Sequence, residues 1–218
     1  MRDQSAAVTS QEKRSLFYSF VRVLAWIIFR ILYPVKYHCT ERVNRSGPFI
    51  MISNHYSLLD PLILALPVKK REVTYLAKKE LGSNPVGAWV MKNLHAILVD
   101  RHNSDMKAMR ACLTTLNQGR ILGVFPEGTR HKHGLMEEIE EGLPLIALRS
   151  GVPVVPVLIS QKPRLFRLTH CYAGEEIPIQ DLMQHGVNKE TCQQMMDRMR
   201  KIYREMMDMH QKNIHLKN

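Results

Sequence analysis

The stretch FIMISNHYSLLDPLILAL, residues 49–66, places an apolar run before a polar loop and a second apolar run after it. Residues 49–52 are all apolar, and a short run of this kind predicts a buried strand. Pro61 suits the first turn of a helix, because proline has no backbone N–H that would need a partner there. We therefore expect a strand, a loop and a helix that ends at about Leu66, which is the repeating unit of α/β proteins.

The same unit recurs along the rest of the chain. Apolar runs that alternate with helical patterns favour an α/β fold, with a largely parallel central sheet flanked by helices. Further strands are expected at residues 73–76, 96–99, 121–125 and 152–159 and near 167–173, and helices at 15–33, through 89–91, at 104–117 and near 139–150.

The length of 218 residues and the hydrophobic content of 45% are enough for one substantial core. We divide the chain into an N-terminal membrane-associating segment (1–46), an α/β core (47–185) and a C-terminal Met-rich helix (186–218). Methionines at helical spacing in that last segment could contact acyl chains or a partner. Packing of this helix on the core is the preferred interpretation.

The formal net charge of +11 favours an anionic partner, which could be nucleic acid, an anionic lipid surface or a phosphorylated substrate. The basic residues are scattered, and the sequence has no recognisable helix-turn-helix, zinc-finger or RNA-reading motif. We therefore expect no nucleic-acid partner.

The cysteines and histidines give no sign of a metal centre. The four cysteines lie far apart without a C-x-x-C pair, which argues against a metal cluster or a disulfide framework and fits a reducing, cytosolic setting. His131 and His133 flank a lysine in a polar stretch, where histidines are usually solvated. We predict that the protein has no metal site.

Residues 15–33 are rich in apolar side chains, but Arg22 and Arg30 interrupt them. A spanning helix needs about 20 mostly apolar residues, and a central arginine is costly in a bilayer. On a helix, polar and basic residues with Trp26 form one stripe, and leucine, isoleucine and phenylalanine form another. This pattern predicts an amphipathic helix in the membrane interface; the alternative is a helix packed on the protein's own core.

His55 and Asp60 are candidates for the chemistry, because a neutral imidazole can accept a hydroxyl proton near pH 7. A carboxylate beside it would fix the tautomer and stabilise the imidazolium. In a loop that enters a helix, the chain can fold Asp60 back toward His55. Asp60 before Pro61 could instead be a plain N-cap, or one carboxylate oxygen could accept backbone N–H groups while the other faces His55.

The block FPEGTR, residues 125–130, follows a predicted strand, where α/β folds place ligand loops. Gly128 lets the backbone approach a ligand closely, Thr129 can donate a hydrogen bond, and Arg130 can grip a phosphate with two donors. Glu127 could orient Arg130. The alternative is a turn with a surface salt bridge of little energetic value. Arg101 is a second candidate phosphate ligand, since it also follows a predicted strand.

Direct attack by an acceptor hydroxyl on an activated acyl group is the expected route. The sequence has no G-x-S-x-G motif, and no cysteine has an obvious base beside it, so a covalent acyl-enzyme is less favoured. Together the two blocks predict a site that deprotonates a hydroxyl while it holds a phosphate.

These blocks, in this order, resemble the glycerolipid acyltransferases, in particular the bacterial-type 1-acyl-sn-glycerol-3-phosphate acyltransferases. The resemblance runs from about residue 49 to 160, and four segments carry it: 54–61, 99–101, 125–130 and 152–157. One departure is the acidic stretch at 137–141, where members commonly carry a basic residue before the following glycine. A solvated acidic helix start is the simpler interpretation of that stretch.

The resemblance implies that His55 and Asp60 are catalytic and that Arg101, Glu127, Gly128 and Arg130 bind the glycerol phosphate. It also implies transfer of a fatty acyl group to the sn-2 hydroxyl of lysophosphatidic acid, which forms phosphatidic acid. The donor would be the thioester of acyl-CoA or acyl-carrier protein, as a co-substrate with no further cofactor. The expected location is the cytoplasmic side of the cell membrane, where the enzyme would be peripheral or monotopic.

Two alternatives stay open. The acceptor could be glycerol 3-phosphate or another lysophospholipid. The chain could also be a non-catalytic protein that binds a membrane surface through its charge and its N-terminal helix.

Overall fold

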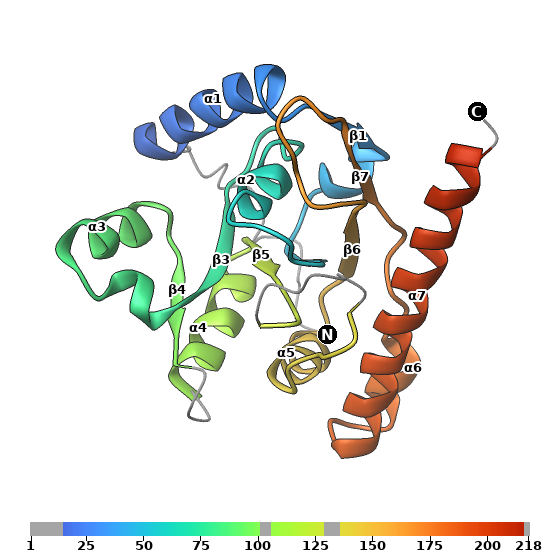
Figure 1. The fold of residues 1–218 in the computed structure, drawn as a ribbon. Coiled ribbons are helices and arrows are strands. Elements are labelled where there is room, and N and C mark those ends of the chain that lie inside the picture. Colours follow the sequence, from blue (N-terminus) through green and yellow to red (C-terminus); the bar gives the residue numbers. More distant parts are fainter. Residues whose placement is uncertain (1–14, 101–105, 129–135, 216–218) are drawn as a thin grey trace.

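A computed structural model describes residues 15–100, 106–128 and 136–215, and these residues form a seven-stranded sheet with helices on both faces (Figure 1). The strand order is β1-β7-β6-β2-β5-β3-β4, and every neighbouring pair is parallel except β6 and β7. The predicted α/β fold with a largely parallel sheet is therefore confirmed. The strands are β1 (Val35–His38), β2 (Phe49–Ser53), β3 (Val73–Lys78), β4 (Ile97–Val99), β5 (Ile121–Val124), β6 (Val154–Ile159) and β7 (Thr169–Ala173).

The helices connect the strands and cover the sheet. They are α1 (Leu16–Ile31), α2 (Asp60–Ala65), α3 (Pro85–Asn93), α4 (Met106–Asn117), α5 (Gly142–Ser150), α6 (Gln180–Gln184) and α7 (Lys189–His215), with 3₁₀ turns at Thr40–Val43 and Lys79–Gly82.

Alternate residues of β2 face two separate hydrophobic clusters, because successive side chains of a strand point to opposite faces of a sheet. Ile50 and Ile52 pack with residues of α4, α5 and α7. Phe49 and Met51 pack with residues of α1 and α2 on the other face. All five residues of β2 are buried, as expected for a central strand covered on both sides. The strand that leads to His55 is thus held rigidly from both faces.

Several elements differ from the sequence expectations. The edge strand β1 was not predicted, because it has only four residues, two of them Lys36 and His38, and no clear apolar alternation. The short helix α6 was also missed. The helix expected near 139–150 begins later, at Gly142, so the acidic stretch precedes the helix instead of forming its first turn.

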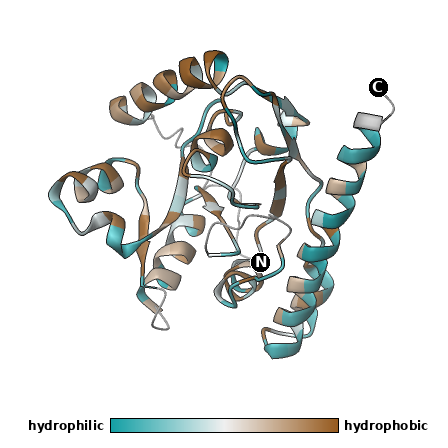
Figure 2. Ribbon diagram, in the orientation of Figure 1, coloured by the Kyte–Doolittle hydropathy of each residue, from teal (hydrophilic) through white to brown (hydrophobic). Residues whose placement is uncertain are grey.

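Helix α1 packs on the core along one side and presents apolar side chains on the other. Tyr18, Ala25 and Phe29 are buried. Leu16 and Phe20, which belong to the predicted apolar stripe, are 90% and 65% exposed. Arg22, which belongs to the predicted polar stripe, turns toward the protein, where its guanidinium donates to the carbonyl groups of Ala65, Leu66 and Val68. Figure 2 shows the predominantly hydrophobic ribbon of this helix.

No helix among the described residues has the length and the apolar character needed to cross a bilayer. At the other end of the chain, α7 buries one side against the sheet. Met195, Met199 and Tyr203 are fully buried there, whereas Met209 is exposed.

Candidate active site

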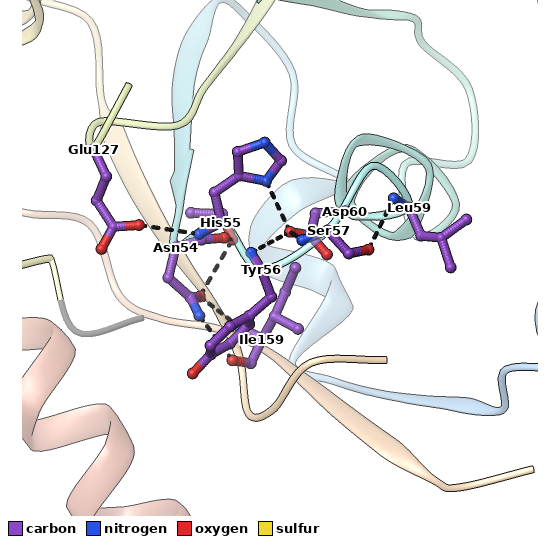
Figure 3. Close-up of polar contacts among 9 residues, drawn as sticks. Asn54, His55, Tyr56, Ser57, Leu59, Asp60, Glu127 and Ile159 are labelled. Atoms are coloured by element: carbon purple, nitrogen blue, oxygen red, sulfur yellow. Dashed lines mark hydrogen bonds and ion pairs between the residues drawn. The ribbon is translucent and has the colours of Figure 1, made fainter. Parts of the chain in front are cut away.

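Strand β2 delivers His55 to the carboxyl edge of the sheet. The strand ends at Ser53, and the side chain of the next residue, Asn54, continues the hydrogen bonding to β6. Asn54 Nδ2 donates to the Ile159 carbonyl, and Asn54 Oδ1 accepts from the Ile159 N–H, both at 2.9 Å. Asn54 is completely buried. This reciprocal pair fixes the backbone directly before His55 (Figure 3).

His55 and Asp60 lie in direct contact. His55 Nδ1 is 2.8 Å from Asp60 Oδ2, and the exposed fraction is 16% for the imidazole and zero for the carboxylate. With Nδ1–H donating to the carboxylate, the neutral ring carries its free lone pair on Nε2. Figure 3 shows this second nitrogen pointing away from Asp60. The ring is therefore oriented to accept a proton from a group on its outer side.

Asp60 is the first residue of α2, and its carboxylate folds back over the preceding loop. Oδ2 also accepts the backbone N–H groups of Tyr56 at 2.6 Å and Ser57 at 2.7 Å. Three donors thus converge on one oxygen of the buried carboxylate, which fixes the position of Asp60 against the imidazole.

The geometry excludes two alternatives that the sequence left open for Asp60. The plain N-cap alternative is wrong, because Leu59 occupies the N-cap position and makes no side-chain cap. The division of roles between two oxygens is also wrong: Oδ2 serves both His55 and the backbone, whereas the buried Oδ1 has no hydrogen-bond partner among the described residues. The turn through Tyr56 and Ser57 is tight enough to bring their N–H groups to the oxygen that faces the ring.

Aromatic side chains hold the imidazole from its face. The rings of His55 and Phe125 are stacked with centroids 4.2 Å apart, and Tyr75 stacks on Phe125 at 6.2 Å. The Tyr75 hydroxyl donates to the carbonyl of Pro61 at 2.8 Å, which ties β3 to the start of α2. Gly123 makes room for this tyrosine, since a Cβ there would lie 2.3 Å from its ring.

Glu127 joins the second sequence block to His55. Its Oε2 accepts the backbone N–H of His55 at 3.2 Å, and its Oε1 accepts that of Met136 at 2.8 Å. The side chain is only 4% exposed. Glu127 therefore anchors the backbone of the imidazole residue, a role that sequence reasoning did not assign to it.

Gly128 occupies a backbone conformation that disfavours other residues. Its φ is +64°, and an added Cβ would lie 2.6 Å from Oε1 of Glu140. The Gly128 N–H donates to the carbonyl of Phe125 at 3.1 Å and closes a turn directly after β5. The glycine is thus required by the turn and by the close approach of the acidic stretch.

The remaining predicted phosphate ligands, Arg101, Thr129 and Arg130, lie outside the described residues. Strand β4, which precedes Arg101, is parallel to β3, so its carboxyl end opens at the same edge of the sheet as His55. It is three strands from β2, roughly 14 Å at the usual strand spacing.

Tyr203 of α7 links β2 and β6, the two strands that lead to the site. Sequence reasoning did not identify this residue. Its hydroxyl donates to the carbonyl of Ile52 at 2.7 Å and accepts the N–H of Val157 at 3.3 Å. Burial raises its pKa well above the usual value. The sequence signal was a single tyrosine within a run of methionines, and nothing in that pattern identifies its backbone partners.

The negative charge of Asp60 also acts on the core beneath it. Burial raises the pKa of the Cys171 thiol to about 12, and the charge of Asp60 adds to the increase. Desolvation and the nearby Glu127 carboxylate raise the pKa of Tyr56. Among the described residues, no cluster of three or more His, Cys, Asp or Glu side chains has a geometry suited to a metal ion.

A family model described as Acyltransferase matches residues 34–160, which is more than half of the chain. The 1-acyl-sn-glycerol-3-phosphate acyltransferase of Streptococcus pneumoniae is 28% identical over 145 residues, which cover 65% of this chain and 53% of that protein. The lyso-ornithine lipid O-acyltransferase of Pseudomonas aeruginosa is 32% identical over 145 residues, covering 65% and 54%.

The crystal structure of the 1-acyl-sn-glycerophosphate (LPA) acyltransferase from Thermotoga maritima aligns with a TM-score of 0.65. The alignment covers 86% of this chain and 78% of that one at 22% identity, which shows a shared fold. The chain spans about half the length of the two curated relatives named above. The matched segment 34–160 contains His55, Asp60, Glu127 and Gly128.

Proposed function

Since the chain belongs to the Acyltransferase family, we propose that it transfers a fatty acyl group from a thioester to the sn-2 hydroxyl of 1-acyl-sn-glycerol-3-phosphate and forms phosphatidic acid. The observation that carries this proposal is the 2.8 Å contact between His55 Nδ1 and the buried Asp60 carboxylate. The name of the Streptococcus pneumoniae relative supports the choice of reaction.

In the proposed reaction, Nε2 of His55 takes the proton of the acceptor hydroxyl as its oxygen attacks the thioester carbonyl. Asp60 holds the ring and stabilises the imidazolium that forms. The C–S bond then breaks, and the proton passes from the imidazolium to the departing thiolate. The products are an ester and a free thiol. A positioned base contributes about 10² to 10⁴ in rate, so the orientation of the two substrates must supply much of the rest.

We assign the acceptor phosphate to Arg101 and to the block formed by Glu127, Gly128, Thr129 and Arg130. Guanidinium groups bind phosphate oxygens in a two-donor geometry. The two described residues of that block shape the site: the Glu127 carboxylate accepts the backbone N–H of His55, and Gly128 forms the turn that precedes Thr129. The chain's net charge of +11 favours an acceptor and a surface that are both anionic.

We further propose a peripheral or monotopic position on the cytoplasmic side of the cell membrane, with α1 in the lipid interface. The exposed apolar side chains of α1 support this position. The thioester donor would be acyl-CoA or acyl-carrier protein, and no resident cofactor or metal is needed for the proposed steps.

The experiment that tests the function follows free thiol released from an acyl thioester, with and without lysophosphatidic acid. We expect acceptor-dependent release by the purified protein and no release by His55→Ala. The matched control is His95→Ala, because His95 is also a histidine that contacts a carboxylate, that of Glu72 at 3.5 Å. Undiminished turnover by His55→Ala would remove the imidazole from the reaction, and acceptor-independent release would favour a thioesterase.

A second acceptor class is supported by the lyso-ornithine lipid O-acyltransferase relative, which is 32% identical. Its named substrate is a lysolipid of a different class from lysophosphatidic acid. Parallel assays with lysophosphatidic acid, lyso-ornithine lipid and glycerol 3-phosphate distinguish these acceptors. Turnover of lyso-ornithine lipid alone would replace the proposed acceptor while leaving the roles of His55 and Asp60 in place.

A further inference from the structure

The loop between β6 and β7, residues 160–168, presents large apolar side chains to the outside. Leu165, Phe166 and Leu168 are 54%, 72% and 47% exposed. Single exposed apolar residues are common on protein surfaces, but a contiguous group within four positions of one loop marks an interaction site. We call residues 160–168 the apolar loop.

Phe166 is held in an unfavourable backbone conformation. Its φ is +56°, in the left-handed region that bulky residues rarely adopt. Asparagine or glycine would fit this position with less strain. The Phe166 ring is exposed, so burial in the core does not offset the cost of this backbone conformation. Strain of this kind clusters at functional sites, where the side chain serves another purpose. The exposed ring therefore points to a partner outside the chain.

The apolar loop lies beside α1 and beside the active-site edge. The Phe166 N–H donates to the carbonyl of Leu32, at the end of α1, at 2.7 Å. In Figure 1 the loop is the orange segment next to that end of the helix. The loop also begins directly after Ile159, the residue that exchanges two hydrogen bonds with Asn54. The loop thus connects the end of α1, through one backbone hydrogen bond, with the edge of the sheet that carries His55.

The apolar loop and the neighbouring N-terminal segment carry positive charge. The apolar loop carries Lys162, Arg164 and Arg167, all of them exposed. Residues 15–40 and 160–173 contain no aspartate or glutamate, so no acidic residue of these segments offsets their cations. Apolar side chains surrounded by lysine and arginine match a bilayer with anionic headgroups, which offers both hydrocarbon and negative charge.

We propose that the apolar loop is a second membrane anchor, which inserts Leu165, Phe166 and Leu168 into the surface of an anionic bilayer beside α1. Its cations contact the headgroups, and its fixed attachment to Asn54 through Ile159 holds the catalytic edge close to the lipid. A second copy of the chain is a poorer occupant, because a symmetric contact would bring the same cations against one another. The inference deepens the proposed function and relies on it only for the membrane setting.

The primary test is sedimentation of the full-length chain with vesicles of phosphatidylcholine containing about 30% phosphatidylglycerol, in the absence of any acyl donor. Phe166→Asn removes the ring and suits the positive φ, so the fold should be kept. We expect the partition constant to fall at least about fivefold. Val187→Asn is the matched control, since Val187 is an exposed apolar residue outside the loop, two positions before α7; its partition constant should not change.

The charge of the loop is tested separately with Arg164→Gln and Arg167→Gln. Each change should weaken binding about fivefold on anionic vesicles and have little effect on vesicles of phosphatidylcholine alone. His55→Ala should bind vesicles as well as the unaltered chain. Loss of the proposed catalysis and loss of the proposed anchor are therefore recognised by different measurements.

Insertion itself is measured with Phe166→Trp in a chain that also carries Trp26→Phe and Trp89→Phe, which replace both native tryptophans. Brominated acyl chains should quench the indole fluorescence when vesicles are added. Vesicle binding without quenching would overturn the proposal, as would an unchanged partition constant for Phe166→Asn. Sedimentation equilibrium that shows a dimer dissociated by Phe166→Asn, with no vesicle binding, would overturn it in favour of a second copy.

Discussion

Arg22 of α1 donates to the carbonyl oxygen of Ala65 at 2.6 Å, and Ala65 is the last residue of the helix that begins with Asp60. The same guanidinium donates to the carbonyls of Leu66 and Val68, both at 2.7 Å. Carbonyls at a helix end lack intrahelical partners, and a cation there also complements the helix dipole. The N-terminal helix is thus bonded to one end of the helix whose other end carries the carboxylate of the active site.

Arg22→Ala should lower the free energy of unfolding by about 2 to 3 kcal/mol, because three carbonyl groups lose a charged donor. Arg22→Lys should recover part of the loss. Arg30→Ala is the matched control: Arg30 is exposed on the same helix, and its removal should change stability by less than about 0.5 kcal/mol. Urea unfolding measures all three variants, and equal losses for Arg22→Ala and Arg30→Ala would contradict the role assigned to Arg22.

Asp60→Asn should lower kcat by about 10² to 10⁴ while the protein stays folded. The amide oxygen of asparagine can still accept the N–H groups of Tyr56 and Ser57, but the neutral side chain cannot stabilise an imidazolium. Steady-state kinetics of thiol release provide the measurement, and circular dichroism provides the control for folding. A folded variant with normal kcat would show that the carboxylate is dispensable.

Gly128→Ala should destabilise the protein by about 1 to 3 kcal/mol and lower acyl transfer, because its methyl group combines a positive φ with a clash against Glu140. Gly47→Ala separates the two effects. Gly47 has a φ of +75° and no heavy atom within 4 Å of an added Cβ, so its cost should be about 1 kcal/mol without loss of activity. If both variants behave alike in thermal unfolding and in the assay, the contact with Glu140 is unimportant.

The stability of the protein should fall as the pH rises above about 8.5, the pKa of a thiol in an unfolded chain. The folded pKa of Cys171 is raised to about 12, so the folded state keeps a proton that the unfolded state loses. This contribution is complete below the unfolded pKa and is lost as the pH approaches 12. Urea unfolding at pH 8, 9 and 10 should give a shallower decline for Cys171→Ala. Identical slopes would exclude the thiol as a cause.

Much of the sheet could be predicted because its central strands, such as residues 49–52 and 121–124, are apolar runs that lie close to glycine or proline. The central strand of residues 49–52 needs no tertiary information, since a run without polar residues must be buried on both faces. β1 escaped prediction because Lys36 and His38 make an edge strand resemble a loop. The strand order also had to come from the structure, because β2 pairs with β5 and β6, which are distant in the sequence.

For the site, the proximity of His55 and Asp60 could be anticipated from the loop that separates them. The number of donors on one carboxylate oxygen could not, because it depends on the exact turn through Tyr56 and Ser57. The bond from Tyr203 to Ile52 spans 151 positions and follows from the docking of α7. Arg22 was interpreted as a membrane-interface residue because carbonyl partners leave no trace in an amino-acid pattern.

The pair of hydrogen bonds between Asn54 and Ile159 restricts which amino acids evolution can place at position 54. The Asn54 carboxamide makes the two hydrogen bonds to Ile159 that a backbone peptide group of β2 would otherwise make. The main chain can therefore turn away from the sheet directly at Asn54. Aspartate has the same shape, yet it would set a negative oxygen against the Ile159 carbonyl. Leucine would fill the volume but leave the N–H and the carbonyl of Ile159 without these hydrogen bonds. Position 54 therefore tolerates little besides its present amide.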